Sequence, residues 1–309
     1  MIAVNADNFA RAESDLMFSG LLADAGGVGQ WVHFREPVPL DHQNVIRMNR
    51  DTLYSAAIVD VSAGATLTLP DAGERYLSAM VVTQDHYLPD IFHGPGTFTV
   101  TADTDYVLIG VRTLVDPNDP ADVAAVNALQ DQLVVTAGSA RPFALADYDS
   151  DAQTATRKAL LELAAGLPDF RHGFGKRDEV DPVRHLICAA AGWGGLPETE
   201  AHYVNISPGL PVGDYRLRLA DVPVDAFWSV SLYDADGYFE PNPSGVNNVN
   251  SVTAVRDADG AVTVNFGVDH GDETNFLTVM DGWNLLLRMY RLRPEALDGR
   301  WTPPAIEPA

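Results

Sequence analysis

The sequence predicts an α+β protein that is mainly β, with two antiparallel β-sandwich or jelly-roll-like domains and an α-helical segment between them. Short apolar or alternating stretches, separated by Gly, Pro and Asp, occur early and late in the chain, whereas the middle has helical spacing. The clearest strand lies within residues 223–239, which are rich in aromatic and β-branched residues. Because side chains alternate along a strand, Phe227 and Trp228 place one ring on each of its faces. We therefore expect this strand in the middle of a sandwich.

The length of the chain indicates more than one domain. It has 309 residues with 46% hydrophobic content, which is more than a single typical domain core needs. Four parts are predicted: an N-terminal helical arm at 1–29, a first β domain at 30–117, a helical segment at 118–198 and a second β domain at 199–309.

The N-terminal arm contains a predicted helix over 7–24, where Asp7 is a candidate N-cap. The apolar residues expected on its inward face are Phe9, Leu16, Met17, Leu21 and Leu22. Short strands at even spacing follow, which is typical of a sandwich or barrel. They are expected at 32–35, 53–61, 66–69, 75–82, 96–100 and 106–112.

The middle segment predicts three helices. Asp119 and Asp181 are each followed by proline, which favours a helix that begins there. A further helix is expected at about 151–165, before Gly166, and the helix from Asp181 ends near Gly192. The first helix has an apolar face of Val123, Val126, Leu129, Leu133 and Val134, and the second has one of Ala159, Leu160, Leu163 and Ala164.

The second β domain shows the strand pattern again. Residues 215–219 alternate between apolar and charged, and the stretch 223–239 follows. The Asp-Ala-Asp-Gly sequence at 257–260 predicts a hairpin turn. Further strands are expected at 251–255, 261–266 and 283–292.

The composition excludes some classes of partner. The formal net charge is −23, from 43 acidic and 20 basic residues. Such a surface repels nucleic acid and anionic membranes, so we expect neither as a partner. The N-terminus lacks a positive segment followed by a long apolar one, and no uncharged apolar stretch reaches the length of a membrane span. We expect a soluble, cytoplasmic protein.

Cys188 is the only cysteine, so no disulfide can form within the chain. It lies in the apolar run 186–191. This position favours a buried, unreactive thiol over a nucleophile.

Two dense polar blocks are candidates for acid–base chemistry. One holds Asn49, Arg50, Asp51 and Tyr54, and the other is residues 84–87. An Asp beside a His can act as a general-base pair, so Asp51, Asp85 and His86 are the predicted catalytic residues. Arg50 can hold a substrate carboxylate in a bidentate clamp, and Asn49 and Tyr54 are further substrate-binding candidates.

A structural alternative exists for the first block. An Asn-Arg-Asp sequence before a strand can form a turn whose side chains satisfy the backbone, with Arg50 paired to Asp51. Trp228 and Tyr233 are added as substrate-binding candidates, because an Asn-rich loop follows them and could bind a polyol. That loop is equally explained by turn chemistry.

The stretch 85–93 contains residue types that could bind a metal. Asp85, His86, Asp90 and His93 are ligand types that suit zinc or iron. Their spacing matches no established signature, so we predict no metal ligands and no cofactor.

Two stretches together carry a family resemblance. The first is Asn49-Arg50-Asp51-Thr52-Leu53-Tyr54-Ser55, and the second is Phe227-Trp228-Ser229 with the later Gly282-Trp283-Asn284. They resemble the paired families known as domain of unknown function 1254, in the N-terminal half, and domain of unknown function 1214, in the C-terminal half. The resemblance covers about residues 30–115 and 185–305. It implies two β domains joined by helices, and it implies no reaction.

Two functions remain open. One is an enzyme that acts by acid–base chemistry on a small polar organic substrate at the rim of the first β domain. The alternative is a non-catalytic protein that binds a small carboxylate or carbohydrate, or a structural assembly protein, and a homo-oligomer is possible in either case. The enzyme requires the blocks 49–54 and 84–87 to face one pocket, with His86 partly open to solvent.

Overall fold

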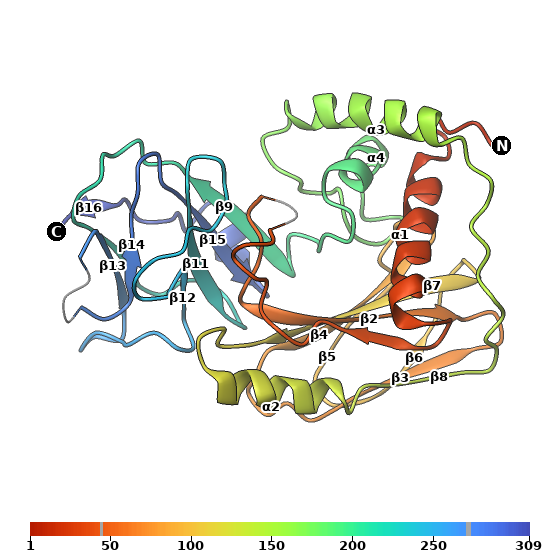
Figure 1. Ribbon diagram of the computed structural model, residues 1–309, viewed down its shortest axis with the longest axis horizontal. Helices are drawn as coiled ribbons and strands as arrows, with labels where there is room; N and C mark the ends of the chain where they lie inside the picture. The colour runs from red at the N-terminus through yellow and green to blue at the C-terminus, as the bar shows by residue number, and fades with distance from the viewer. Residues whose placement is uncertain (44–45, 270–272) are drawn as a thin grey trace. The chain divides into compact units, whose positions relative to one another are not determined.

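The computed structural model describes residues 1–43, 46–269 and 273–309, and Figure 1 shows its elements. The chain divides into two compact units. The first contains residues 1–35, 53–114 and 125–198, and the second contains 36–52, 115–124 and 199–309. The four domain boundaries expected from the sequence stay predictions.

The first unit contains a β-sandwich. One sheet has five strands in the order β1-β2-β7-β4-β5, and the other has three in the order β6-β3-β8. Alternating apolar residues of both sheets, such as Val59, Leu67 and Ile109, form the core between them. The strands are β1 Trp31–His33, β2 Thr52–Asp60, β3 Ala65–Leu69, β4 Leu77–Thr83, β5 Ile91–His93, β6 Gly96–Val100, β7 Tyr106–Leu114 and β8 Val134–Ala137.

Three helices of the first unit pack together: α1 Phe9–Ala25, α3 Ser150–Ala164 and α4 Pro182–Ala191. Their shared core includes Phe9, Leu160 and Ile187. The N-cap of α4 follows the sequence pattern, because Asp181 accepts two backbone N–H bonds of the first turn, and Asp149 caps α3 in the same way.

Cys188 lies on α4 and is fully buried. The helix is so close to the 170–175 loop that a Cβ at Gly173 would lie 2.3 Å from the Cys188 sulfur. Burial raises the pKa of the Cys188 thiol to about 11. The predicted buried thiol is confirmed.

The second unit is also a sandwich, and two four-stranded sheets enclose its core. Their orders are β14-β13-β10-β16 and β12-β11-β15-β9, and among the described pairs of these two sheets only β13–β14 is parallel. The strands are β9 Ala201–Ile206, β10 Tyr215–Leu219, β11 Trp228–Tyr233, β12 Asn248–Asn250, β13 Val262–Gly267, β14 Phe276–Thr278, β15 Asn284–Tyr290 and β16 Glu307–Pro308. Two more helices are α2 Pro120–Gln130, whose residues are divided between the units, and α5 Pro294–Leu297.

The predicted mainly β, α+β fold is confirmed, and the jelly-roll connectivity stays a prediction. β11 pairs with β12 on one side and β15 on the other, and all its residues are buried. The aromatic stretch therefore does form an interior strand. The hairpin strand expected at 251–255 is wrong: Ser251, Val252 and Thr253 form a turn in which Asn250 accepts the backbone N–H groups of Val252 and Thr253.

Three helix faces differ from the sequence expectation. In α1, Glu13, Ser14 and Asp15 are buried while Leu16 and Met17 are exposed. Periodicity failed here because Glu13 is paired with Arg157 and hydrogen-bonded by Gln153, so a charged residue is accommodated inside. The other errors are Ala159 and Leu163, which are exposed on α3, and Leu133 and Val134, which lie beyond the end of α2.

No helix in the described ranges is both long and apolar enough to cross a membrane.

The cap of α4 gives a direct test of the helix prediction. Asp181→Ala removes the acceptor for the N–H groups of Val183 and Arg184 and should cost about 1 kcal/mol. We expect the melting temperature, followed by circular dichroism, to fall by about 2–4 °C. Asp178→Ala is the matched control, since Asp178 is exposed and its side chain bonds to no described residue. Equal melting of both variants would contradict the capping role.

Candidate functional site

A buried polar cluster covers one face of the β12-β11-β15-β9 sheet in the second unit. Along β11, Trp228, Val230 and Leu232 enter the apolar core, so the alternate residues occupy the opposite face. The register places Arg288 of β15 beside Ser229, and Asn248 of β12 beside Ser231. We call the following set the Asp51 cluster: Asp51, Ser229, Ser231, Tyr233, Asn248 and Arg288.

Asp51 is fully buried and both its oxygens are engaged. The Ser229 hydroxyl donates to Oδ2 at 2.5 Å and the Asn248 amide donates to Oδ1 at 2.6 Å. Burial raises the pKa of Asp51, against the charge of Arg288 and these two hydrogen bonds. The carboxyl is therefore held in place by donors from two neighbouring strands.

Arg288 fixes the chain segment that precedes Asp51. It donates to the carbonyl oxygens of Arg47 and Met48, at 2.8 and 3.0 Å, and to the hydroxyl of Tyr233 at 2.8 Å. Burial alone lowers the pKa of Arg288, but Tyr233, Tyr290 and Asp51 outweigh it and raise the pKa above its usual value. Arg288 thus remains charged and ties residues 47–48 to the sheet.

The other predicted residues of this block serve the same segment. Asn49 accepts the N–H of Asp51 and donates to the Tyr290 hydroxyl at 3.0 Å. Arg50 donates to the carbonyl oxygen of Val38. The predicted pairing of Arg50 with Asp51 is wrong, because Asp51 is bonded by Ser229 and Asn248 instead.

Trp228 and Tyr233, the predicted ligand-binding aromatics, are both buried. Trp228 belongs to the apolar core between the two sheets. Tyr233 packs against Phe239 and donates its hydroxyl to the Met48 carbonyl oxygen at 2.8 Å. Both rings contribute to packing, and their ligand-binding roles stay predictions.

Tyr54, Asp85 and His86 belong to the first unit. Tyr54 is half-buried on β2, with the Arg112 guanidinium over its ring. The Asp85 carboxylate pairs with Arg11 at 2.8 Å and with Arg177 at 3.5 Å. It therefore holds two arginines and does not orient the His86 ring.

His86 is sealed from solvent. Its exposed fraction is 0%, and its Nε2 accepts the N–H of Gly194 at 2.9 Å, while Nδ1 has no partner among the described residues. The ring stacks on Trp193 and lies beside His185. Burial, together with the neighbouring His185, lowers the pKa of His86 to about 3. The partial exposure that a catalytic His86 requires is not found.

The structure gives no metal-binding arrangement for Asp85, His86, Asp90 and His93 among the described residues. In the chain outside 44–45 and 270–272, no group of three or more His, Cys, Asp or Glu side chains could hold a metal ion. His86 instead accepts a backbone hydrogen bond.

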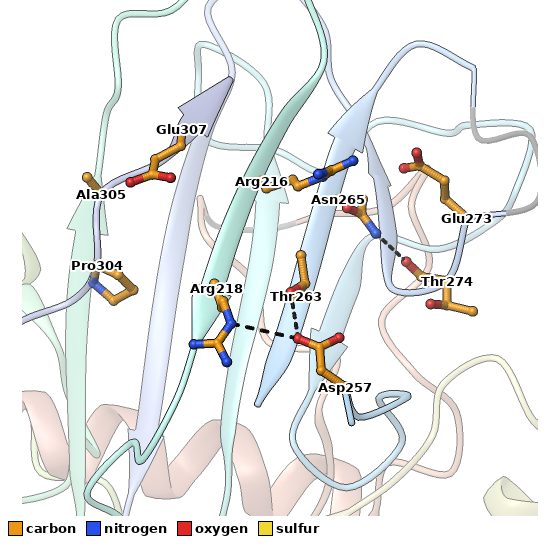
Figure 2. Close-up of a pocket in the computed structure, with 10 residues that line it drawn as sticks. All are labelled: Arg216, Arg218, Asp257, Thr263, Asn265, Glu273, Thr274, Pro304, Ala305 and Glu307. Carbon is orange, nitrogen blue, oxygen red and sulfur yellow. Dashed lines mark hydrogen bonds and ion pairs between the residues drawn. The ribbon is translucent and has the colours of Figure 1, made fainter. Parts of the chain in front are cut away.

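An open groove of about 700 Å³ lies in the second unit, on the outer face of the β14-β13-β10-β16 sheet (Figure 2). The inner side chains of β10 are buried, so Arg216 and Arg218 stand on the outer face. Thr263 and Asn265 of β13 and Glu307 of β16 stand beside them. Its other lining residues are Asp257, Glu273, Thr274, Pro304 and Ala305.

Sequence reasoning missed this groove, although part of its signal was present. Residues 215–219 alternate between apolar and charged in the sequence, and the burial pattern shows Arg216 and Arg218 exposed on the same face. The contribution of Glu307 depends on a pairing between strands about 90 residues apart, which no local pattern reveals.

Removal of Asp51 tests the buried cluster. Asp51→Ala leaves the Ser229 hydroxyl and the Asn248 amide as buried donors without their acceptor, so we expect a loss of about 2 kcal/mol or more. The melting temperature should fall by about 4–8 °C. Asp41→Ala is the control, since Asp41 is exposed in the same segment and its side chain bonds to no described residue. A similar melting temperature for both variants would refute the anchoring role.

The burial of His86 predicts a dependence of stability on pH. Its folded pKa of about 3 lies below the unfolded value of about 6.5, so the unfolded chain binds the proton first. The contribution of neutral His86 is therefore complete above about pH 6.5 and is lost as the pH falls toward 3.

We expect His86→Asn to flatten this slope. Asn tolerates the positive φ of 66° at this position and cannot titrate. Urea midpoints measured between pH 7 and 4 check the difference in slope between the variant and the native chain. His185 is retained in both and also has a lowered pKa, so only the difference reports on His86. Parallel slopes would show that His86 is not the titrating group.

Comparison with known proteins places the chain among families and structures without an assigned activity. Residues 28–88 match a family described as protein of unknown function (DUF1254), and residues 210–295 match protein of unknown function (DUF1214). A crystal structure of the VPA0106 protein from Vibrio parahaemolyticus is similar, with a TM-score of 0.76 and 19% identity over 98% of this chain and 97% of that chain. A putative uncharacterised protein from Burkholderia cenocepacia is similar with a TM-score of 0.51 and 19% identity, over 96% of this chain and 86% of that chain. No curated protein matches the chain.

The two matched families occur in the order that the Asn-x-Asp-Thr-Leu-Tyr-Ser and Phe-Trp-Ser stretches predicted. The two crystal structures are too distant in sequence to show more than the fold. The chain thus matches the DUF1254 family in its N-terminal half and the DUF1214 family in its C-terminal half, in the arrangement expected from the sequence.

Proposed function

We propose that this protein binds a small polar ligand, a carboxylate or a carbohydrate, in the groove of the second unit and does so without catalysis. The observation that carries the proposal is Arg216: it lies on the groove floor, and its guanidinium has no hydrogen bond or ion pair with any described side chain or backbone group. A guanidinium binds a carboxylate through two parallel hydrogen bonds. A volume of about 700 Å³ lies in the range of small-molecule sites.

The alternative, an enzyme that uses Asp85 and His86 as acid and base, has less support. A general base must reach the proton that it abstracts. His86 is fully buried and accepts a backbone hydrogen bond, and Asp85 is paired with two arginines. The same applies to Asp51, whose oxygens both accept hydrogen bonds inside the Asp51 cluster. These contacts favour a structural role for the three residues.

The groove predicts a specific ligand-binding defect. A thermal-shift screen of small carboxylates and sugars should give at least one ligand that raises the melting temperature of the native chain. We expect Arg216→Ala to abolish that shift, because it removes the guanidinium that holds the ligand.

Arg300→Ala is the matched control, since it removes the same charge from an exposed arginine of the second unit that is paired with Asp298 outside the groove. This variant should retain the ligand-induced shift. A ligand whose shift survives Arg216→Ala binds elsewhere, and that result would reject the groove as the binding site.

A further inference from the structure

Among the residues that the structure describes, the groove has one unpaired cation that is available to a ligand. Arg218 is already neutralised, because its guanidinium pairs with Asp259 and lies 4.0 Å from Asp257. Arg216 has no such partner among the described residues, and Figure 2 shows its guanidinium extending over β13 toward Asn265. The ligand therefore needs one anionic group and gains nothing from a second.

Hydrogen-bonding groups flank this cation on both neighbouring strands. The strand register pairs Arg216 with Asn265 on one side and with Glu307 on the other. Asn265 donates its amide to the Thr274 carbonyl oxygen at 2.9 Å, which leaves its own oxygen as an acceptor. The Glu307 carboxylate bonds to none of the described residues. Both groups accept hydrogen bonds, so the ligand must supply donors beside its anion.

A second polar row lies two residues along the strands. Arg218 pairs with Thr263 in the register, and the Thr263 hydroxyl donates to Asp257 at 2.8 Å. Two residues along a strand span roughly 7 Å, so a ligand that covers both rows must be polar along its whole length. None of the described lining residues is aromatic, and Pro304 and Ala305 are the apolar ones. The described lining therefore offers no aromatic ring for stacking and little apolar surface for a long apolar ligand side chain.

The charge of the groove limits the ligand further. Asp257, Glu273 and Glu307 face the same space as the two arginines, and the whole chain carries a net charge of −23. Phosphate-rich ligands and other polyanions are repelled by such a surface. Hydroxyl groups suit it, because each can donate to a carboxylate and accept from a guanidinium.

We propose that the groove binds a sugar acid, that is, a saccharide or polyol with a single carboxylate. Arg216 holds the carboxylate, and Asn265 and Glu307 accept hydrogen bonds from the adjacent hydroxyls. Thr263 and Asp257 contact the hydroxyls farther along the ligand. This assignment rests on the proposed binding function and names its ligand class.

Calorimetric titration of the full chain with four probes tests the assignment. Glucuronate carries both the carboxylate and the hydroxyls, acetate carries only the carboxylate, glucose carries only the hydroxyls, and glutamine carries a carboxylate with an ammonium group. We expect glucuronate to bind at least about tenfold more tightly than the other three probes, which is the scale of one charge-assisted bidentate contact.

Two variants locate the contacts. Arg216→Ala should reduce glucuronate affinity to that of glucose, and Glu307→Ala should reduce the preference for glucuronate over acetate, because it removes an acceptor for the hydroxyls and a charge that repels both carboxylates. Arg300→Ala should change neither. All three residues lie on the surface, and equal melting temperatures of the free variants check that folding is intact.

Each of the other outcomes contradicts either the ligand assignment alone or the binding function as well. If acetate binds as tightly as glucuronate and Arg216→Ala abolishes both, the groove is a general carboxylate site and the sugar-acid assignment is wrong. If glutamine binds most tightly, the ligand class is an amino acid and the assignment is again wrong. If no probe binds, or if Arg216→Ala leaves glucuronate affinity unchanged, the proposed function of the groove fails as well.

Discussion

The second unit depends on one buried carboxyl. Asp51 lies in the 36–52 segment, far in sequence from the strands it contacts, and receives hydrogen bonds from Ser229 and Asn248. Without these donors, burial of the Asp51 carboxyl would be strongly unfavourable for folding. Arg288 secures the same segment through the carbonyl oxygens of residues 47 and 48. The contacts of Asp51 and Arg288 thus attach a remote segment to the sheet.

Polar and ionisable side chains of the first unit are also bonded to one another. His86 and Asp85 are candidate catalytic residues in the sequence, yet both are engaged within the unit, and Asp85 pairs with Arg177. The Arg177 guanidinium lies 4.1 Å from the centre of the Tyr87 ring, which stacks in turn on His185. Ionisable residues that cluster in sequence can therefore form a packed layer. Their residue types alone do not distinguish such a layer from an active site.

Much of the fold could be predicted from local pattern, whereas the candidate site could not. β10 was clear because apolar and charged residues alternate along it, and α4 was clear because Asp181 and Pro182 mark its start. The inward face of α1 was wrong, since pairing of Glu13 with Arg157 is a long-range contact that helical periodicity does not contain. The groove is of this second kind. Arg216, Asn265 and Glu307 meet through strand register, and each is an ordinary surface residue until the sheet is assembled.

The packing of Cys188 against Gly173 makes it possible to follow local opening of the first unit alone by thiol modification. The chain has a single thiol, it is completely enclosed, and it belongs to the first unit. A thiol reagent can reach it only when α4 and the 170–175 loop move apart, so the rate of modification measures local opening there. The second unit contains no cysteine and is silent to the reagent. The rate at which Cys188 of the native chain reacts therefore reports local opening of the first unit.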